Sequence, residues 1–487
     1  MKKQLSLILL AAILASAAAC SDAKTPGNET SGLVTDDTVG VTTELGDGLP
    51  DKDMTGFSFN IHHSTQSSMS WVNLELNAEA ENGDYLNDAI FKRNRYIEER
   101  FKCELNITED SWDNNANNFR SIVMSGDNMY DIFFLYGNRV MSNLDCMADF
   151  NNVPHLNLDK EWWNPLATGA YNVGGKQLAV AGNYTLSYLS SAGCFIFNKR
   201  IYETLGTNES LYDLVRDGKW TDDKLFEIAR KAVRDLDGNG KYDLNDQFGI
   251  ISESQKAFFN SLIGGADIYY ITKGSDGYPE FSLKSNEKGI SFIQKLVDVC
   301  NTDPYMYYDS SNDPNTASDD VKFENGSALF MRTRTNYISN FRNMKDDFGI
   351  IPSPKYDEKQ EIYITNSGVG EIAVLPRSFD KDRLDNIGIL LEAMAFRSQQ
   401  TIVPTYKEIL LQTKFTRDEE SGEMIDIIFS GISFDLGGVA FESTVTSPVM
   451  TDIFIPRNNA VVSAFETISN SFENTIENIR IEVDDMP

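Results

Sequence analysis

Acidic and amide side chains recur at short intervals between Asp235 and Asp246, in a spacing suited to holding a cation. Counted from the first of them, oxygen-bearing side chains occupy loop positions one, three, five, nine and twelve, which are Asp235, Asp237, Asn239, Asp243 and Asp246. Gly240 at position six allows the sharp turn of an EF-hand-type loop, and Lys241 at position seven would supply its backbone carbonyl. Because Ca²⁺ takes six to eight oxygen ligands, the loop predicts a calcium site. The alternative is an Asx-rich surface turn, since turns favour the same residue types.

The surroundings of this loop favour a structural ion over a catalytic one. Asp246 is shorter than the bidentate Glu usual at position twelve, and no clear second helix follows it. Thr221 is expected to cap a helix before the loop, and residues 248–251 form a short apolar run typical of a buried strand. The ion would therefore fix the angle between a helix and a strand. Such sites in extracellular modules bind with Kd of about 0.1 to 1 mM, so this loop would fill outside the cytoplasm.

The N-terminal residues predict secretion and a lipid anchor. Lys2 and Lys3 precede an apolar run over residues 5–15, and small residues lead to Cys20. We expect a signal peptide over residues 1–19 and acylation of Cys20, as in bacterial lipoproteins, on the outer face of the cell membrane. The alternative is an ordinary cleaved signal in which Cys20 is incidental. Residues 20–55 are rich in Thr, Gly, Asp and Glu, so we expect a disordered tether.

Composition narrows the range of partners. The chain carries 43 Lys and Arg against 73 Asp and Glu, a formal net charge of -30. Such a charge argues against binding nucleic acid or an anionic membrane surface. The remaining cysteines, Cys103, Cys146, Cys194 and Cys300, are widely spaced, which argues against a zinc site and leaves open whether they pair.

The first part of the body alternates expected strands and helices. Strands are expected over residues 57–62, 103–109 and 130–135, with helices over residues 87–101 and 117–124 between them. This order is typical of a doubly wound α/β sheet, in which ligands gather at the carboxyl ends of the strands. Tyr136, Asn138 and Arg139 are therefore expected near a cleft, unless they only cap a strand. Trp162 and Trp163 are expected to pack in the core.

Catalytic motifs are lacking in the sequence. It contains no G-x-S-x-G, no H-E-x-x-H and no P-loop, and only 3 histidines. Pairs of carboxylates for a glycosidase can always be found among 73 acidic residues, so their abundance indicates nothing. We therefore expect a binding protein rather than an enzyme. A calcium-stabilised adhesion protein would predict repeats or several calcium loops, and the sequence has one such loop.

The order of several segments resembles the bacterial extracellular solute-binding proteins, family 1-like, of carbohydrate ABC importers. The resemblance rests on residues 130–135 (YDIFFL), 174–187 (GGKQLAVAGNYTLS), 195–206 (FIFNKRIYETLG), 218–250, 322–333 (KFENGSALFMRT), 346–368 and 392–429. It implies a type II periplasmic-binding-protein-like α/β fold of two lobes joined by a hinge. The first lobe would comprise residues 56–182 with 348–395, and the second residues 183–347 with 396–487.

The resemblance also implies a function and a set of ligand contacts. A monomeric lipoprotein would capture an extracellular carbohydrate, an oligosaccharide, between its lobes and deliver it to the permease of an ABC transporter. The alternatives are a secreted glycoside-active enzyme and a binding protein for a peptide or another polar solute. Sugar sites combine planar polar groups with aromatic rings. The candidate contacts are Tyr136, Asn138, Arg139, Asn183, Tyr184, Arg332, Thr335, Asn336, Tyr337, Asn366 and Ser367, and the alternative for each is ordinary surface or interlobe packing.

Overall fold

The computed structural model describes residues 46–68, 75–240, 242, 245–303, 307–308, 319–368, 370–412 and 419–487. Residues 47–487 form one compact unit. The expected signal peptide, Cys20 and residues 21–45 of the tether lie outside the described residues, as do Lys241 and Asp243 of the acidic loop. The expected tether is wrong over residues 47–55, which pack on the first lobe: Met54 is 4% exposed, its N–H donates to the carbonyl of Phe101 (2.7 Å), and Asp47 forms an ion pair with Arg100. No helix within the described ranges is both long and apolar enough to cross a membrane.

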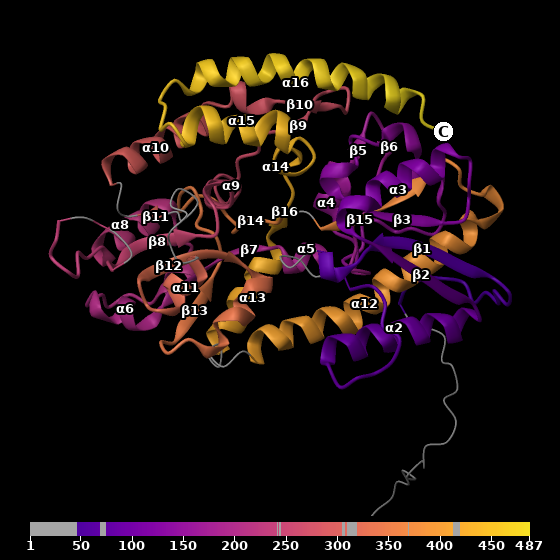
Figure 1. Cartoon of the computed structure of the whole chain (residues 1–487), viewed down its shortest axis with the longest axis horizontal. Coiled ribbons are helices and arrows are strands. Elements are labelled where there is room, and N and C mark those ends of the chain that lie inside the picture. The colour runs from indigo at the N-terminus through magenta and orange to yellow at the C-terminus, as the bar shows by residue number, and fades with distance from the viewer. Residues whose placement is uncertain are drawn as a thin grey trace, which may run out of the picture. The chain divides into compact units, whose positions relative to one another are not determined.

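The first lobe is built on a five-stranded sheet in the order β2-β1-β3-β15-β4 (Figure 1). Its strands are β1 (Ser58–Ser64), β2 (Glu104–Asp110), β3 (Ile132–Tyr136), β4 (Met147–Ala148) and β15 (Glu371–Pro376). β1 pairs in parallel with β2 and β3, whereas β15 is antiparallel to β3 and β4. Helices α2 (Tyr85–Phe101) and α3 (Trp112–Met124) connect the parallel strands. The expected β-α-β-α-β order is confirmed, with each boundary within five residues.

The second lobe repeats this plan in the order β11-β8-β12-β7-β13. Its strands are β7 (Gly193–Asn198), β8 (Phe248–Ser252), β11 (Tyr307–Tyr308), β12 (Ala328–Arg334) and β13 (Phe348–Ile351). β8 pairs in parallel with β11 and β12, and β7 is antiparallel to β12 and β13. In each sheet, one strand follows a crossing between the lobes and runs antiparallel to both of its neighbours: β15 in the first sheet and β7 in the second. The expected two-lobe α/β fold of type II is therefore confirmed.

Helices of the second lobe cover its sheet and its edges. They are α6 (Lys199–Thr204), α7 (Leu211–Arg216), α8 (Asp222–Ala232), α9 (Gln255–Gly265), α10 (Glu287–Thr302), α11 (Asp319–Glu324) and α13 (Glu419–Ser430). The remaining short elements include three two-stranded sheets, β5 (Asn172–Val173) with β6 (Lys176–Gln177), β9 (Thr272–Lys273) with β10 (Pro279–Glu280), and β14 (Thr365–Asn366) with β16 (Ile432–Ser433), and the helices α4 (Pro165–Ala170), α5 (Ser187–Ser190), α14 (Leu436–Val439) and α15 (Ser447–Val449).

Two of the expected lobe boundaries are wrong. Residues 348–351 were expected in the first lobe, but as β13 they pair with β7 in the second sheet. The chain therefore returns to the first lobe between β13 and β15, because β13 pairs with β7 of the second sheet and β15 with β3 of the first. The expected boundary at residues 395–396 falls inside a single helix, α12 (Leu384–Gln412), so this crossing is made by a continuous helix rather than by a loop.

The last long helix, α16 (Val461–Asp484), also spans both lobes (Figure 1). Its apolar residues Val461, Phe465, Ile468, Phe472, Ile476 and Ile479 are buried, as their spacing predicts. The helix contacts α10 of the second lobe and the turn Leu144–Cys146 of the first. Just beyond it, Arg377 donates a hydrogen bond to the carbonyl of Asp485 (3.1 Å), and Lys176 donates one to that of Met486 (3.1 Å). Residues 396–487 thus do not belong to the second lobe alone.

Each face of the first sheet is buried in a different apolar cluster. Along β3, Phe133 and Leu135 belong to a cluster that continues into the second lobe, whereas Ile132 and Phe134 belong to one that packs under α12. Trp162 and Trp163 lie in the second of these clusters, which confirms that this pair packs in the core. Burying each such side chain contributes about 2 to 3 kcal/mol. The first sheet is thus buried on both faces.

Candidate functional site

A cavity of about 310 Å³ is lined by residues of both lobes. The first lobe contributes Trp112, Tyr136 and Asn138, and the second contributes Glu253, Lys256, Ala257, Asn260, Arg332 and Arg334. The crossing segment Asn366–Gly368 and residues Gly438, Val439 and Glu442 complete the lining. Tyr136 is the last residue of β3, and Asn138 follows it. The cavity therefore lies at the carboxyl end of a parallel strand, where an open α/β sheet binds its ligands.

The wall contributed by the first lobe is aromatic. Trp112 is the first residue of α3, two residues past the carboxyl end of β2. Its ring lies edge-on to that of Tyr136, with the ring centroids 6.1 Å apart. The guanidinium of Arg139 lies 5.1 Å from the centre of the Trp112 ring, which is a cation–π distance. An aromatic surface of this kind suits the apolar CH face of a sugar ring.

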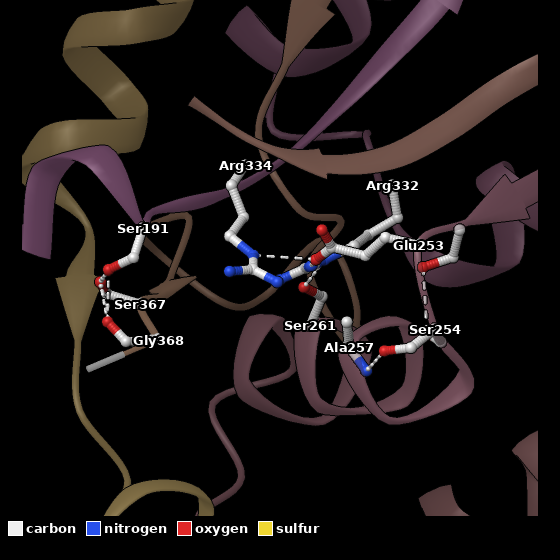
Figure 2. A network of polar contacts seen from close by, with 10 residues as sticks. Ser191, Glu253, Ser254, Ala257, Ser261, Arg332, Arg334, Ser367 and Gly368 are labelled. Atoms are coloured by element: carbon white, nitrogen blue, oxygen red, sulfur yellow. Dashed lines mark hydrogen bonds and ion pairs between the residues drawn. The ribbon is translucent and has the colours of Figure 1, made fainter. Parts of the chain in front are cut away.

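The wall contributed by the second lobe is charged and extensively hydrogen-bonded (Figure 2). Arg332 and Arg334 are two residues apart on β12, so both side chains leave the same face of the strand. Arg332 is 5% exposed; its Nε donates to Ser261 Oγ (2.6 Å), and its Nη1 forms an ion pair with Glu253 Oε1. Arg334 Nε donates to the same Glu253 oxygen (2.9 Å). Burial lowers the pKa of Arg332, and the nearby carboxylate of Glu253 opposes that shift.

The crossing segments form the third side of the cavity and are held together by serine hydroxyls (Figure 2). Ser191 Oγ and Ser367 Oγ are 2.9 Å apart, and Ser367 Oγ donates to the carbonyl of Tyr188 (2.7 Å). Ser191 also donates to the carbonyl of Gly368. Asn366 Nδ2 donates to the carbonyl of Asn260 on α9 (3.2 Å). The segments that enter and leave the second lobe are thus tied together beside the cavity.

Five of the residues predicted from the sequence line this cavity, and six do not. Those that line it are Tyr136, Asn138, Arg332, Asn366 and Ser367. Arg139 stacks behind Trp112 and lines a neighbouring cavity with Arg120 and Asp145. Asn336 and Tyr337 are half-buried in the 3-10 segment Thr335–Asn343, outside the lining.

The remaining three predicted contacts are buried in packing, and we correct their assignment. Tyr184 is 0% exposed and donates its hydroxyl to the carbonyl of Val180, so it belongs to the core. Thr335 is also 0% exposed, and its hydroxyl donates to the carbonyl of Leu189 (2.5 Å). Asn183 is buried, donates to Gln399 and accepts from Tyr188, beside a different cavity at the crossing. Their polar atoms are satisfied within the protein, which explains polar residues in buried positions.

The sequence prediction missed Trp112, Glu253 and Arg334, and each had a signal. Trp112 follows the strand of residues 104–110, so the strand-end rule that identified Tyr136 applies to it as well. Glu253 follows β8 in the same way. Arg334 shares a face with Arg332 by the two-residue period of a strand. Lys256, Asn260 and Glu442 carried no such signal, because only tertiary packing brings their segments together.

The described part of the acidic loop brings three of its carboxylates together. Oxygen atoms of Asp235, Asp237 and Asp246 lie within 4.8 Å of one another. Asp235 accepts hydrogen bonds from the backbone N–H groups of Gly238 (2.7 Å) and Gly240 (2.8 Å), and these bonds lower its pKa. Gly240 has a φ of 75°, in the left-handed region that favours glycine, as the predicted turn requires. The donor set is one that a hard cation such as Ca²⁺ prefers.

The elements that flank the loop hold its two ends close together. Arg234 and Gln247 form an antiparallel bridge, with 3.0 Å between N and O in both directions. Before it, Thr221 caps α8 by accepting from the backbone N–H of Lys224 (3.3 Å), as predicted. After it, β8 is buried in the second sheet. The loop thus connects a helix and a strand whose positions are fixed by packing.

Comparison with known proteins gives matches among solved structures. No family model matches the chain, and no curated protein matches it. UspC of M. tuberculosis has 12% identity and a TM-score of 0.54, and the match covers 88% of this chain and 100% of that one. An extracellular solute-binding protein from Staphylococcus aureus, in complex with maltose, has 15% identity and a TM-score of 0.53, covering 89% and 99%.

A third solved structure has a similar degree of likeness. The cyclic alpha-maltosyl-1,6-maltose binding protein from Arthrobacter globiformis has 14% identity and a TM-score of 0.52, covering 88% of this chain and 98% of that one. At identities this low, the likeness of the structures, with TM-scores of 0.52 to 0.54, shows a shared fold and no more. The chain therefore has the same two-lobe architecture as these proteins, over nearly the whole length of each of them.

Proposed function

We propose that the protein captures an oligosaccharide between its two lobes and presents it to the permease of an ABC importer. The observation that carries the proposal is the cavity at the crossing segments, with aromatic rings on one wall and hydrogen-bonding groups on the other. A sugar offers apolar CH faces and many hydroxyl groups, so it needs both kinds of wall at once. Closure of the lobes would bring the walls together and create the form that a permease recognises.

The ligands of proteins with the same fold support this proposal. The Staphylococcus aureus protein was solved with maltose, and the Arthrobacter globiformis protein is a binding protein for cyclic alpha-maltosyl-1,6-maltose. A glycosidase receives no comparable support from the cavity. The carboxylates that line the cavity are Glu253, which contacts two arginines, and Glu442, which pairs with Lys256. Both carboxylates of the cavity are thus engaged in ion pairs with the protein's own cations, whereas a glycosidase needs two carboxyl groups that flank the scissile bond.

Replacing Trp112 by alanine should weaken oligosaccharide binding by about 1 to 3 kcal/mol, because the ring surface of the first-lobe wall is lost. Titration calorimetry with the ligands found in a glycan-library screen measures the change. Tyr85→Ala is the matched control, since Tyr85 is an aromatic residue 65% exposed at the start of α2. Chromatography of the ligand after incubation should recover it intact. Equal affinity of the Trp112 variant and the wild type would exclude this cavity as the site, and hydrolysed sugar would identify an enzyme.

We also propose that the acidic loop holds a structural Ca²⁺ ion. Asp235, Asp237, Asn239, Asp243 and Asp246 would bind it through their side chains, and Lys241 through its carbonyl. The convergence of three carboxylates supports this proposal, because without a cation their mutual repulsion would destabilise the loop. The ion would brace the connection between α8 and β8.

Calcium at about a hundred times its Kd should stabilise the protein by roughly 2.7 kcal/mol, if the ion binds only the folded state. Adding a chelator should therefore lower the Tm, and Asp237→Ala should lower it and remove the chelator's effect. Asp159→Ala, which changes an exposed aspartate far along the chain from the loop, should leave the chelator's effect intact. Identical melting curves of the wild type with calcium and with chelator would contradict the proposal.

The proposed function requires an extracytoplasmic location close to the permease. We propose that Cys20, which lies outside the described residues, is acylated and anchors a monomeric protein to the outer face of the cell membrane. The tether, limited to residues 20–46, would then hold the lobes at a distance of roughly 30 Å, as a flexible coil of that length allows.

A further inference from the structure

Arg139 contacts the aromatic wall of the cavity from outside it. Its guanidinium lies 5.1 Å from the centre of the Trp112 ring. Arg139 does not line the cavity that Trp112 lines, but a neighbouring one of about 310 Å³, together with Arg120, Asp145 and Glu482. Trp112 follows β2 and Arg139 follows β3, so their contact connects the carboxyl ends of two strands of the first sheet.

Hydrogen bonds fix the backbone of Arg139. Its carbonyl accepts from Ser142 Oγ (3.1 Å) and from Asn143 Nδ2 (2.8 Å). Gly137 begins the same 3-10 turn, and its N–H donates to the carbonyl of Gly370 (3.3 Å), the residue before β15. The side chain of Arg139 therefore starts from a turn that is attached to the first sheet.

The guanidinium of Arg139, in contrast, has no acidic partner among the residues that the structure describes. Its Nε is buried without a hydrogen-bond partner. Of the two acids that line the neighbouring cavity, Asp145 accepts two hydrogen bonds from Arg120 (2.7 Å each). Burial and the nearby charge of Asp145 raise the pKa of Glu482, which favours its neutral form. The contact that the structure gives this guanidinium is the ring of Trp112.

We infer that Arg139 is a positioning residue, which holds the ring of Trp112 in the orientation that receives a sugar ring. This inference rests on the proposed function and adds a residue to its site. A tryptophan at a cavity wall has several rotamers, and binding is weakened when the ligand must order the side chain that it contacts. A planar guanidinium beside the ring, together with the edge-on contact of Tyr136, limits that freedom before the ligand arrives.

Arg139→Gln should weaken sugar binding about three- to tenfold, because the Trp112 ring must then be ordered on binding. Titration calorimetry on the full chain would use trisaccharides and tetrasaccharides from maltodextrin, cellulose, xylan and pectin. Arg139→Met should show the same loss, and Arg139→Lys, which keeps a cation for the ring, a smaller one. Arg95→Gln is the matched control, since the Arg95 guanidinium lies 5.5 Å from the centre of the Phe91 ring on α2, and affinity should not change.

A double-mutant cycle with Trp112→Ala separates positioning from direct contact with the ligand. With the panel member that binds most tightly, Arg139→Gln in the Trp112→Ala background should change affinity by less than about twofold, because the ring through which Arg139 acts is absent. The same loss in both backgrounds would mean that Arg139 acts without the ring, and the inference would be wrong. Wild-type affinity in both Arg139→Gln and Arg139→Met would contradict it as well.

Near-ultraviolet circular dichroism tests the ring directly and needs no ligand. The difference between the spectra of wild type and Trp112→Ala is the signal of the Trp112 ring. In the Arg139→Gln background this difference should fall by about half or more, because a mobile ring gives a weaker signal. The far-ultraviolet spectra of the four proteins should stay the same. If the Gln variants fail to fold, the same cycle with Arg139→Lys replaces them, with a smaller expected fall.

The two measurements distinguish a failure of this inference from a failure of the proposed function. An undiminished ring signal in the Arg139 variants would overturn the inference, whereas sugar binding by the wild type would leave the proposed function standing. Binding of no member of the panel by the wild type would overturn the capture of oligosaccharides, and with it the role of Arg139 in binding, even if the ring signal falls as expected.

Discussion

Replacing Arg93 by alanine lowers the free energy of unfolding by about 3 to 5 kcal/mol, as expected when a buried, hydrogen-bonded charged side chain is deleted. Arg93 lies in the middle of α2 and is 0% exposed. Its guanidinium donates to the carbonyls of Leu76 (2.7 Å) and Tyr184 (2.6 Å), to Ser398 Oγ (3.1 Å) and to Asn94 Oδ1 (2.8 Å). Truncation removes the donor that these acceptors share, leaving only the Leu76 carbonyl with another among the described residues, Asn94 Nδ2 at 3.3 Å, and it opens a cavity.

Denaturant unfolding followed by circular dichroism measures this loss. Arg95→Ala is the control, because Arg95 lies on the same helix with its side chain 57% exposed, and the loss there should stay within about 0.5 kcal/mol. A loss below about 1 kcal/mol for the Arg93 variant would mean that its acceptors find other partners. Since Ser398 belongs to the helix that crosses between the lobes and Tyr184 precedes the first crossing, a confirmed loss would identify Arg93 as a residue that holds two crossings in place.

Glu392→Ala should cost a similar amount, about 2 to 5 kcal/mol. Glu392 lies in α12 and is 0% exposed. It accepts from the indole N–H groups of Trp162 (2.8 Å) and Trp163 (2.7 Å) and from the backbone N–H of Asn157 (3.0 Å). Alanine leaves three buried donors without an acceptor, each costing about 1 to 3 kcal/mol before the structure relaxes. Burial raises the pKa of this carboxyl, which shows that its surroundings penalise the charge more than the three donors favour it.

A matched pair of substitutions separates these contributions. Glu392→Gln keeps one acceptor oxygen and nearly the same volume, so it should cost less than alanine, although its amide N–H groups oppose one of the indoles. Glu408→Ala, on the exposed side of the same helix, should change stability by less than about 1 kcal/mol. Thermal unfolding of the three variants in one buffer gives the ranking. A Glu392→Ala protein as stable as the Glu408→Ala protein would show that the indole N–H groups do not depend on this acceptor.

The sequence predicts those parts of the fold in which apolar residues recur with a clear helical or strand period, or in which strands and helices end at clear signals. The apolar spacing along α16 and the strand–helix alternation before Tyr136 both specify local structure, and both are confirmed. Residues 348–351 show why lobe assignment is harder. A four-residue apolar run fits the middle of either sheet, and only its hydrogen bonds to β7 decide which sheet it joins.

The residues of the candidate site also fall into those that the sequence could predict and those that only the tertiary structure reveals. A polar or aromatic residue directly after a strand could be predicted, as Tyr136 was and as Trp112 could have been. Tyr184 was misassigned because a tyrosine in a polar segment looks exposed, whereas its hydroxyl is satisfied by a carbonyl four residues away. The grouping of Glu253 with the two arginines depends on the pairing of β8 with β12, which no local pattern encodes.

The helix α16 limits how the lobes can move. An α-helix is stiff along its axis, so it acts as a rod that keeps its two points of attachment at a constant separation. One attachment is to α10 in the second lobe, and the other is the pair of bonds that Arg377 and Lys176 of the first lobe make to carbonyls just past its end. A wide hinge opening that separates these points would have to break that pair of bonds. A twist about an axis that passes close to the rod would leave them intact. The attachment of α16 to both lobes thus favours a relative twist of the lobes, about an axis close to α16, over a wide hinge opening.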